Sequence, residues 1–349
     1  MKLEIKHITK STEDSVTITF TKPDSNFTYK PGQHGIFNFR FNDKLFSRTY
    51  SFNSAPLIDS DLSITVRAVE GGALSNLLIA RQPDSVELEG VTGDFYIQTA
   101  PDKKRNLVMF AAGSGITPII SMIRAMLYQE PLSSISLIYS NRSFDRIIFR
   151  EQLDQLAFDF SDRFKVYHVL TQESTVPEGF SVYYKDKLSK LVIKKLVKSI
   201  AADCDSPSEY YVCGPFSFMQ LVEGVLQTLG IDKSKIFGEH FFIPSTEPEF
   251  NFASLAKRET IIQLKDEEKL LTVEPGMSIL HAALANNIAL AHSCTEGQCG
   301  VCRSLLLSGE VKLRRNHVLT EDELKQGQIL LCQGFPISDN VAVRPLNKP

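Results

Sequence analysis

The sequence predicts a multidomain protein: an antiparallel β-barrel, an α/β domain with a parallel sheet, and a small α+β domain. Three observations lead to this prediction. The chain of 349 residues is too long for one ordinary core. Short strands separated by turns come first, and repeated strand–helix units follow them. Three clustered cysteines lie near the C-terminal end, in a region with one main helix.

Residues 1–102 are expected to form the barrel domain. Their apolar segments are short, alternate with polar residues and end at turn residues, which favours an antiparallel sandwich or barrel. The expected strands are residues 15–21, 35–42, 48–54, 62–69, 85–90 and 94–99.

Residues 103–243 are expected to form the α/β domain. Residues 106–113 form an apolar strand run, and the helix expected over residues 117–130 has Ile119, Ile120 and Ile123 with Met126 on one face. Repeated units of this kind imply a parallel sheet covered on both faces, as in nucleotide-binding domains. Further strands are expected at 134–141, 164–171, 209–215 and 235–242, and further helices at 149–158, 187–200 and 217–230.

Residues 244–257 contain prolines and polar residues without periodicity, which predicts a linker. Residues 258–349 form the third expected domain, in which Ser278 is a candidate helix N-cap. Its expected elements are a hairpin over 260–276, a helix over 278–287, a strand over 303–313, a short helix around 320–327 and a strand over 328–334.

The charge balance gives no support for nucleic acid or an anionic membrane as partner, because 38 Lys and Arg residues stand against 41 Asp and Glu. No segment approaches the ~18–20 apolar residues of a membrane span. The N-terminal segment lacks the apolar run of a signal peptide. We therefore expect a cytoplasmic protein, where disulfides are disfavoured and clustered cysteines more often bind metal or take part in catalysis.

The cysteine cluster has the spacing of a plant-type 2Fe-2S site. Four residues separate Cys294 from Cys299, two separate Cys299 from Cys302, and Cys332 follows at a distance. Glycines beside the central cysteine, at 297 and 300, let the loop turn tightly and direct N–H groups at sulfur. A structural zinc site is the alternative, but it usually takes two C-x2-C pairs and this chain has one.

The segment SRTYSFNS contains Arg48, Tyr50 and Ser51 in an R-x-Y-S pattern on an expected strand. Here the chain resembles the ferredoxin-NADP reductase superfamily, whose barrel carries R-x-Y-[ST]. The resemblance implies that Arg48 binds a flavin phosphate, that Tyr50 packs on the isoalloxazine ring and that Ser51 approaches flavin N5; Thr49 lies between them in the same site. A guanidinium suits a phosphate and an aromatic face suits a flat ring.

The segment TVRAVEGGALSNLL resembles the second phosphate-binding segment of the same family, because paired glycines precede an expected helix start, where free N–H groups can bind phosphate. The flavin residues implied there are Val66, Arg67, Gly72, Leu74 and Ser75.

Two further segments resemble the nicotinamide site of that family. FAAGSGITP follows an apolar strand and opens a helix, and it fits the family form G-x-G-[IV]-[TA]-P. A C-G-P follows the strand over 209–215, at the carboxyl edge where open parallel sheets bind ligands. The residues implied are Gly113, Gly115, Thr117, Pro118, Cys213, Gly214 and Pro215.

The segment IYSNRSFDR is expected to select between nicotinamide cofactors. A 2′-phosphate favours Arg and hydroxyl groups, whereas a bare ribose favours an acidic partner. Ser140, Arg142 and Arg146 favour NADPH over NADH, although Asp145 weakens that preference. The segment GEHFF resembles the family's E-x-aromatic, which implies Glu239 and Phe241 beside the flavin.

The resemblance covers essentially the whole chain and implies the oxygenase-reductase type, with FAD, NADPH or NADH, and a C-terminal ferredoxin domain of β-grasp fold. Segments such as IIFREQL most resemble the reductase components of phenylacetyl-CoA epoxygenase and similar oxygenases. A nicotinamide supplies paired electrons and a cluster accepts single ones, so the flavin must lie between them. The implied catalytic residues are Tyr50, Ser51, Cys213 and Glu239, and the implied partner is an oxygenase or other acceptor that docks transiently near the cluster.

Several alternatives remain open at this point. The barrel of an FMN protein would keep the same arginine and tyrosine. The acceptor could be a di-iron or a Rieske oxygenase. The chain could also be an electron-transfer or redox-sensing subunit that binds no nicotinamide, or an interaction module with structural zinc.

Overall fold

The computed structural model describes residues 1–21, 27–42, 44–69, 72–173, 175–202, 206–241, 250–265, 267–292, 295, 297, 300–316 and 318–347. The chain divides into two compact units: Met1–Phe46 with Tyr50–Phe241, and Phe242–Pro349 with Ser47–Thr49. No helix in the described ranges is both long and apolar enough to cross a lipid bilayer.

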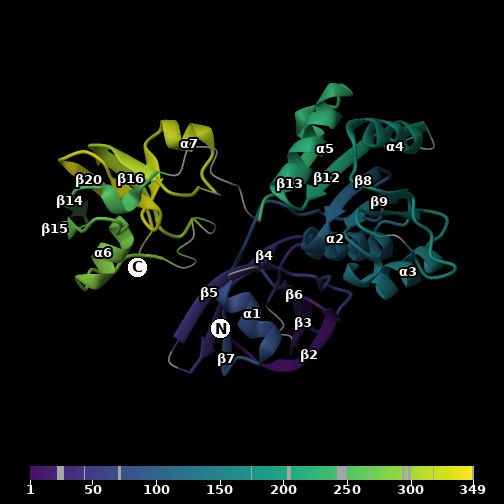
Figure 1. Ribbon diagram of the computed structural model, residues 1–349, viewed down its shortest axis with the longest axis horizontal. Coiled ribbons are helices and arrows are strands. Elements are labelled where there is room, and N and C mark those ends of the chain that lie inside the picture. Colours follow the sequence, from purple (N-terminus) through teal and green to yellow (C-terminus); the bar gives the residue numbers. More distant parts are fainter. Residues whose placement is uncertain are drawn as a thin grey trace. The chain divides into compact units, whose positions relative to one another are not determined.

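Two small sheets form the barrel domain (Figure 1). Apolar and polar side chains alternate along the strands, so each sheet turns one apolar face to a shared core. Ile18, Phe20, Phe37 and Phe52 are fully buried in that core, and helix α1 (Ala73–Ala80) covers it. One sheet has the order β1 (Lys2–Leu3), β7 (Ser85–Thr92), β4 (His34–Phe41), β5 (Lys44–Ser51), and the other β2 (Ile5–Thr12), β3 (Ser15–Phe20), β6 (Leu62–Arg67).

The strand expected over residues 94–99 is not formed. This segment has no regular secondary structure and joins neither barrel sheet. Phe95 and Ile97 are buried in the core of the α/β domain instead, and the Ile97 N–H donates to the Pro31 carbonyl. The strand prediction for this segment is therefore wrong, because its apolar side chains serve the α/β core and the segment connects the two domains.

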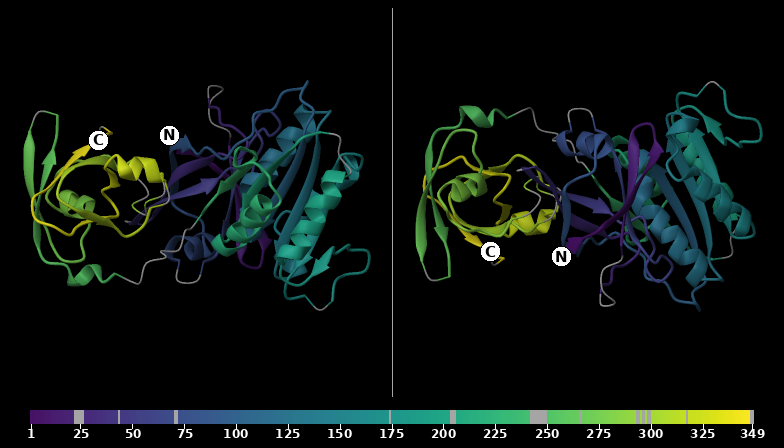
Figure 2. Two further views of the ribbon diagram at one scale, coloured as in Figure 1. Left: turned by 90° about the horizontal axis from the view of Figure 1, so that it is seen from above. Right: turned by 90° about the horizontal axis from the view of Figure 1, so that it is seen from below.

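The α/β domain has a six-stranded parallel sheet with helices on both faces, as expected (Figures 1 and 2). Alternate side chains of the central strand point to opposite faces, so Met109 packs with helices α2 and α3 and Phe110 packs with α4 and α5. The strand order is β11 (Tyr184–Lys185), β10 (Phe164–Leu170), β9 (Ser134–Asn141), β8 (Asn106–Ala112), β12 (Ser208–Cys213), β13 (Ile236–Glu239). The helices are α2 (Ile116–Gln129), α3 (Arg150–Asp159), α4 (Lys190–Ala202) and α5 (Phe216–Thr228).

Helix α2 is buried on nearly all sides, beyond the single face that the sequence predicts. Its second buried surface lies against the barrel. The Ser121 hydroxyl donates to the Ser54 carbonyl at 2.6 Å, and Arg124 forms a bidentate ion pair with Asp59. The barrel and the parallel sheet therefore share one helix.

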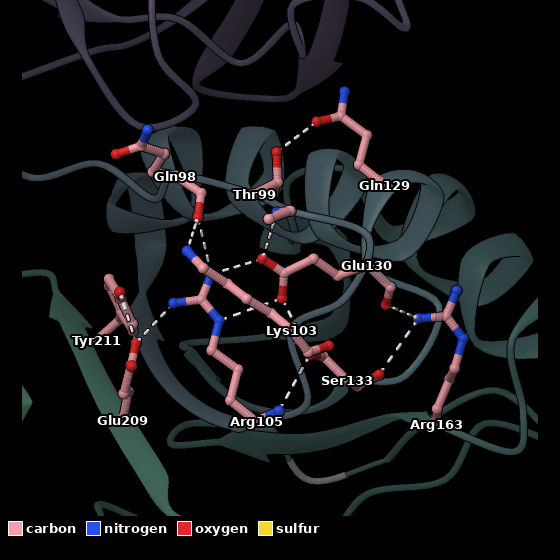
Figure 3. A network of polar contacts seen from close by, with 11 residues as sticks. Gln98, Thr99, Lys103, Arg105, Gln129, Glu130, Ser133, Arg163, Glu209 and Tyr211 are labelled. Carbon is pink, nitrogen blue, oxygen red and sulfur yellow. Dashed lines mark hydrogen bonds and ion pairs between the residues drawn. The ribbon is translucent and has the colours of Figure 1, made fainter.

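A network of charged side chains holds the connection between these two domains (Figure 3). Glu130 is fully buried, and its carboxylate accepts from Arg105 and from the Ser133 hydroxyl. A third nitrogen of Arg105 donates to Glu209 at 2.9 Å. Burial without these partners would cost several kcal/mol, so the network fixes the segment that enters β8.

The third domain is a five-stranded mixed sheet with one main helix, α6 (Ile279–Ala285), as expected. Ser278 caps α6, because its hydroxyl accepts from the His281 N–H. The strand expected over 303–313 divides in two, since Gly309 turns the chain with φ +75°. The elements are β14 (Arg258–Gln263), β15 (Glu268–Val273), β16 (Arg303–Ser308), β17 (Val311–Leu313), α7 (Glu321–Lys325), β18 (Gln328–Leu330), β19 (Gly334–Pro336) and β20 (Val341–Pro345).

Candidate functional site

The carboxyl ends of β8 and β12, which lie side by side in the sheet, bring the two glycine motifs together, and we call this edge the crevice. Strand order reverses between these neighbours, and open parallel sheets bind ligands at such a switch point. Gly113–Gly115 follows β8 and leads into α2, while Gly214 and Pro215 follow β12 and lead into α5. Two helix N-termini with free N–H groups therefore lie at this edge, as anion binding requires.

The glycines of the crevice cannot carry a side chain. A β-carbon on Gly115 would lie 2.7 Å from the Gly214 nitrogen and closer still to the Cys213 carbonyl. Gly113 has φ +55°, and a β-carbon there would lie 2.6 Å from a terminal nitrogen of Arg67. The missing β-carbons therefore let the two loops, and the Arg67 guanidinium, approach each other closely at this edge of the sheet.

Buried hydroxyl groups hold the Gly113–Gly115 loop. Thr117 donates to the Ser114 carbonyl at 3.0 Å, and Tyr139 on β9 donates to the Gly113 carbonyl at 3.1 Å. Pro118 is buried in the first turn of α2, where its missing N–H costs nothing. Tyr139 was not among the predicted site residues; its place opposite Ala111 in the sheet is set by strand register.

Glu239 joins the barrel to the α/β domain beside the crevice. One carboxylate oxygen lies 2.9 Å from His34 Nδ1 on β4, and the other accepts from the Ser51 hydroxyl on β5 at 3.2 Å. His34 itself lies against Gly93, where a β-carbon would be 2.8 Å from the imidazole. His34 was missed because 205 residues separate it from its partner.

Cys213 lies opposite Glu239 in the parallel sheet and is fully buried. Burial raises the pKa of the Cys213 thiol well above its ordinary value, and the Glu239 carboxylate raises it further. The thiol is therefore neutral at physiological pH. Phe241 packs against the same core cluster as Cys213.

The predicted flavin residues lie on two elements of the barrel. Arg48, Thr49, Tyr50 and Ser51 follow one another on β5. The Tyr50 ring is half-buried and packs edge-on against Phe39, with ring centroids 5.9 Å apart. A half-buried aromatic ring beside an arginine suits a flat ring that carries a phosphate.

The second predicted flavin segment surrounds the start of α1. Val66 and Leu74 are buried in the barrel core, so they anchor the segment to that core. Gly72 precedes the helix, and a β-carbon on it would lie 2.6 Å from the Ser75 hydroxyl oxygen. No described side chain caps α1, so the first N–H groups of this helix suit a phosphate group.

Arg67 and Arg146, which were predicted for different cofactors, share one carboxylate. Asp14, in the turn between β2 and β3, accepts from Arg67 at 3.0 Å and from Arg146 at 2.8 Å. Ser140 is buried and Arg142 is exposed. Of the three residues predicted for the adenosine end, only Arg146 thus has a charged partner on the barrel among the contacts of the described residues.

Two of the four predicted cluster cysteines lie in the described part of the third domain. Cys302 and Cys332 are buried in the same core, and the Cys302 carbonyl accepts from the N–H next to Cys332. Cys294 and Cys299 lie outside the described residues. Gly297 and Gly300, which lie on either side of Cys299 in the sequence, have φ +75° and +70°, as close approach of backbone to sulfide requires.

Three family models match the chain in succession. An oxidoreductase FAD-binding domain matches residues 2–97, an oxidoreductase NAD-binding domain matches residues 109–224, and a 2Fe-2S iron-sulfur cluster binding domain matches residues 262–336. Each model falls on the domain where the corresponding motifs were identified.

Curated relatives match over nearly their whole length. The chain is 30% identical over 351 residues to one subunit of the 1,2-phenylacetyl-CoA epoxidase of Escherichia coli (strain K12), with 98% of this chain and 96% of the relative covered. It is 30% identical over 354 residues to the ferredoxin reductase component of 3-ketosteroid-9-alpha-monooxygenase of Rhodococcus rhodochrous, with 98% and 95% covered.

Among solved structures, phthalate dioxygenase reductase matches with a TM-score of 0.64 at 22% identity, covering 99% of this chain and 97% of that chain. At this identity the match shows the fold alone. The order of a barrel, a parallel-sheet domain and a ferredoxin domain is thus shared across the full chain.

Proposed function

Because this chain belongs to the ferredoxin-NADP reductase superfamily, in its form with a C-terminal 2Fe-2S domain, we propose that it supplies electrons from NAD(P)H to a separate oxygenase component. The chain is an oxidoreductase with domains for FAD, a nicotinamide and a 2Fe-2S cluster. The observation that carries the proposal is the 3.2 Å hydrogen bond from Ser51 to Glu239, which joins the flavin strand to the nicotinamide crevice.

The flavin, when bound, takes electrons in pairs from the nicotinamide and gives them singly to the cluster. Arg48 binds its phosphate and Tyr50 supports its ring, while Thr49 contributes backbone to the same strand. Ser75 offers its backbone N–H at the start of α1, and Val66 and Leu74 anchor that segment in the core. Gly72 leads into the helix, and its own N–H donates to the Val69 carbonyl.

The crevice binds the nicotinamide cofactor. Gly113 and Gly115 admit the phosphates to the N-terminus of α2, and Arg67 adds a guanidinium beside Gly113. Thr117 and Pro118 shape the first turn of that helix. Gly214 and Pro215 form the opposite wall at the start of α5.

The flavin and nicotinamide rings are positioned by three residues, Ser51, Glu239 and Cys213. Glu239 fixes the Ser51 hydroxyl, and His34 fixes Glu239, so both carboxylate oxygens have defined partners. The neutral Cys213 thiol and the Phe241 ring give the crevice an apolar floor that excludes water. Tight positioning of this kind favours transfer between groups held at contact distance.

Cys294, Cys299, Cys302 and Cys332 hold the cluster, and the acceptor docks transiently beside it in the cytoplasm. The relatives are named as parts of an epoxidase and a monooxygenase, which supports an oxygenase component as acceptor. Phenylacetyl-CoA epoxidase offers the first reconstitution partner to test.

A Cys299→Ser variant tests the order of transfer. We expect it to reduce ferricyanide with NADH or NADPH as the unchanged chain does, because that reaction needs the flavin alone. Reduction of cytochrome c, a one-electron acceptor that probes the cluster, is expected to fail. Cys204→Ser is the matched control and should keep both activities. Loss of both activities in the Cys299 variant, with flavin still bound, would contradict the proposed order.

A further inference from the structure

The ion pairs of Asp14 bear on the choice of nicotinamide cofactor. We infer that Asp14 is a specificity-determining residue: by holding Arg146 on the barrel, it withholds that guanidinium from a 2′-phosphate and makes the chain prefer NADH. The inference rests on the proposed function, since it concerns the cofactor of the same crevice.

The contacts of Asp14 are specific and join the two domains. Its Oδ2 atom accepts from Arg67 Nε at 3.0 Å and from Arg146 Nη1 at 2.8 Å, across 132 residues of sequence in the second case. The other oxygen accepts from the Thr12 hydroxyl at 2.8 Å, and the Asp14 carbonyl accepts from the Ala68 N–H. The carboxylate is therefore fixed from both sides of the hairpin turn.

Electrostatics keep this carboxylate ionised. Burial acts to raise the pKa of Asp14, but the Thr12 hydroxyl and the two guanidinium groups outweigh it and lower the pKa. Arg146 is about one-third exposed and also lies 3.9 Å from Glu13. Asp14, which Arg146 shares with Arg67, is thus its hydrogen-bonded counter-charge before any cofactor arrives.

The remaining charges near the segment after β9 give no compensation. Arg142 is exposed, but Asp145 follows it closely, and the Glu173 carboxylate accepts from the Phe144 N–H at 2.8 Å. Arg150 stacks on the Phe144 ring and lies 3.6 Å from Glu151. With Arg67 included, these residues carry four guanidinium groups and five carboxylates, so the negative charges outnumber the positive ones. The guanidinium groups belong to Arg67, Arg142, Arg146 and Arg150, and the carboxylates belong to Glu13, Asp14, Asp145, Glu151 and Glu173.

A phosphate on the 2′-oxygen brings nearly two negative charges to this surface, whereas a ribose diol brings none. The diol can donate to a carboxylate, and an acidic partner is the usual mark of selection for NADH. Ser140, the hydroxyl residue predicted to meet the phosphate, is buried. The arrangement therefore favours the unphosphorylated cofactor, contrary to the preference that the arginines alone predict.

Equilibrium binding of NAD⁺ and NADP⁺ to the flavin-loaded full chain, followed by titration calorimetry, tests the inference. The unchanged chain should bind NAD⁺ more tightly. Asp14→Asn should raise the affinity for NADP⁺ relative to NAD⁺ about tenfold, the gain from one released charge-assisted contact. The same variant also releases Arg67, which lies beside the phosphates common to both cofactors, so that release should change both affinities alike. Glu13→Gln removes the same charge one residue away on an exposed side chain and should change neither by more than about twofold.

A second comparison keeps the inference testable if Asp14→Asn folds poorly. Arg146→Ala should weaken NADP⁺ binding in the Asp14→Asn background and leave it unchanged in the parent chain, where Arg146 is already held. Loss of NADP⁺ affinity from Arg146→Ala in the parent chain would overturn the inference, as would tighter NADP⁺ than NAD⁺ binding there. Absence of flavin bleaching by both NADH and NADPH would instead refute the proposed function.

Discussion

The two ends of the parallel sheet in the α/β domain are built on different principles. At the amino ends, Arg105, Glu130 and Ser133 form a buried side-chain network in which every charge has a partner (Figure 3). At the carboxyl ends, glycines bring bare backbone together, and the buried Asn141 Nδ2 and His168 Nδ1 atoms have no partner among the described residues. The difference indicates that the amino edge of the sheet contributes mainly to stability, whereas the carboxyl edge is arranged for binding.

Glu130→Gln at the amino end is the largest expected effect. It leaves the buried Arg105 without its main counter-charge, so the free energy of unfolding should fall by about 3–5 kcal/mol in urea titration. The KM for NADH should not change, because the crevice lies at the other edge. Glu209→Gln is the control: it faces the same arginine from a more exposed position, and about 1 kcal/mol is expected. A raised KM for NADH in the Glu130 variant would break the comparison.

His168 gives the carboxyl end a pH dependence in the acidic range. Burial lowers its pKa from 6.5 to about 4. Between these values the unfolded chain binds a proton that the folded chain does not, so stability is lost as the pH falls from 6.5 to 4. The loss is ~3 kcal/mol. His168→Phe should flatten this part of the stability profile in thermal unfolding, and His7→Asn, at an exposed position, should not. Equal slopes in the parent chain and the His168 variant would contradict the assignment.

Gly115→Ala should impair cofactor binding more than stability. Glu130→Gln, by contrast, should impair stability and leave cofactor binding unchanged. The new methyl group meets the backbone of Cys213 and Gly214, which cannot move without opening β12, and a cost of about 1–3 kcal/mol is expected. Flavin bleaching by NADH should be lost even where the protein remains folded. Gly224→Ala, where a β-carbon meets nothing within 4 Å on helix α5, should be neutral or up to about 1 kcal/mol stabilising.

Tyr139→Phe should have the smallest effect on stability, about 0.5–1.5 kcal/mol, because one hydrogen bond to the Gly113 carbonyl is removed. A looser Gly113–Gly115 loop should weaken NADH binding equally in the ground state and the transition state. The KM for NADH should therefore rise and kcat should stay unchanged. Tyr128→Phe, on an exposed part of α2, should leave both constants unchanged. A fall in kcat with constant KM would show that Tyr139 acts on the reacting groups instead.

Much of the fold and of the crevice could be predicted because their determinants are local. Gly113 and Gly115 stand within three residues of each other between an apolar strand and a helix, and the strand–helix alternation needs only periodicity. Ser278 was confirmed as the cap of α6 for the same reason. Where a backbone requirement is met by adjacent residues, the sequence expresses it directly.

The rest depends on pairs that no local pattern records. Asp14 meets Arg146, and His34 meets Glu239, only after the barrel and the parallel sheet have packed together. The segment 94–99 has a strand pattern, but its apolar side chains serve the neighbouring domain. Charges that neutralise one another across such distances can reverse an inference drawn from one of them, as Arg146 illustrates.

The shared helix α2 decides how this protein can be cut and recombined. Ser121 and Arg124 contact the barrel from α2, and the other side of this helix packs on the parallel sheet. A break in the chain near residue 102 would therefore separate two domains that share this buried helix. Gene fusions and domain exchanges should therefore treat residues 1–241 as a single cassette. Any exchange of ferredoxin modules belongs after that cassette, where the second compact unit of the chain begins.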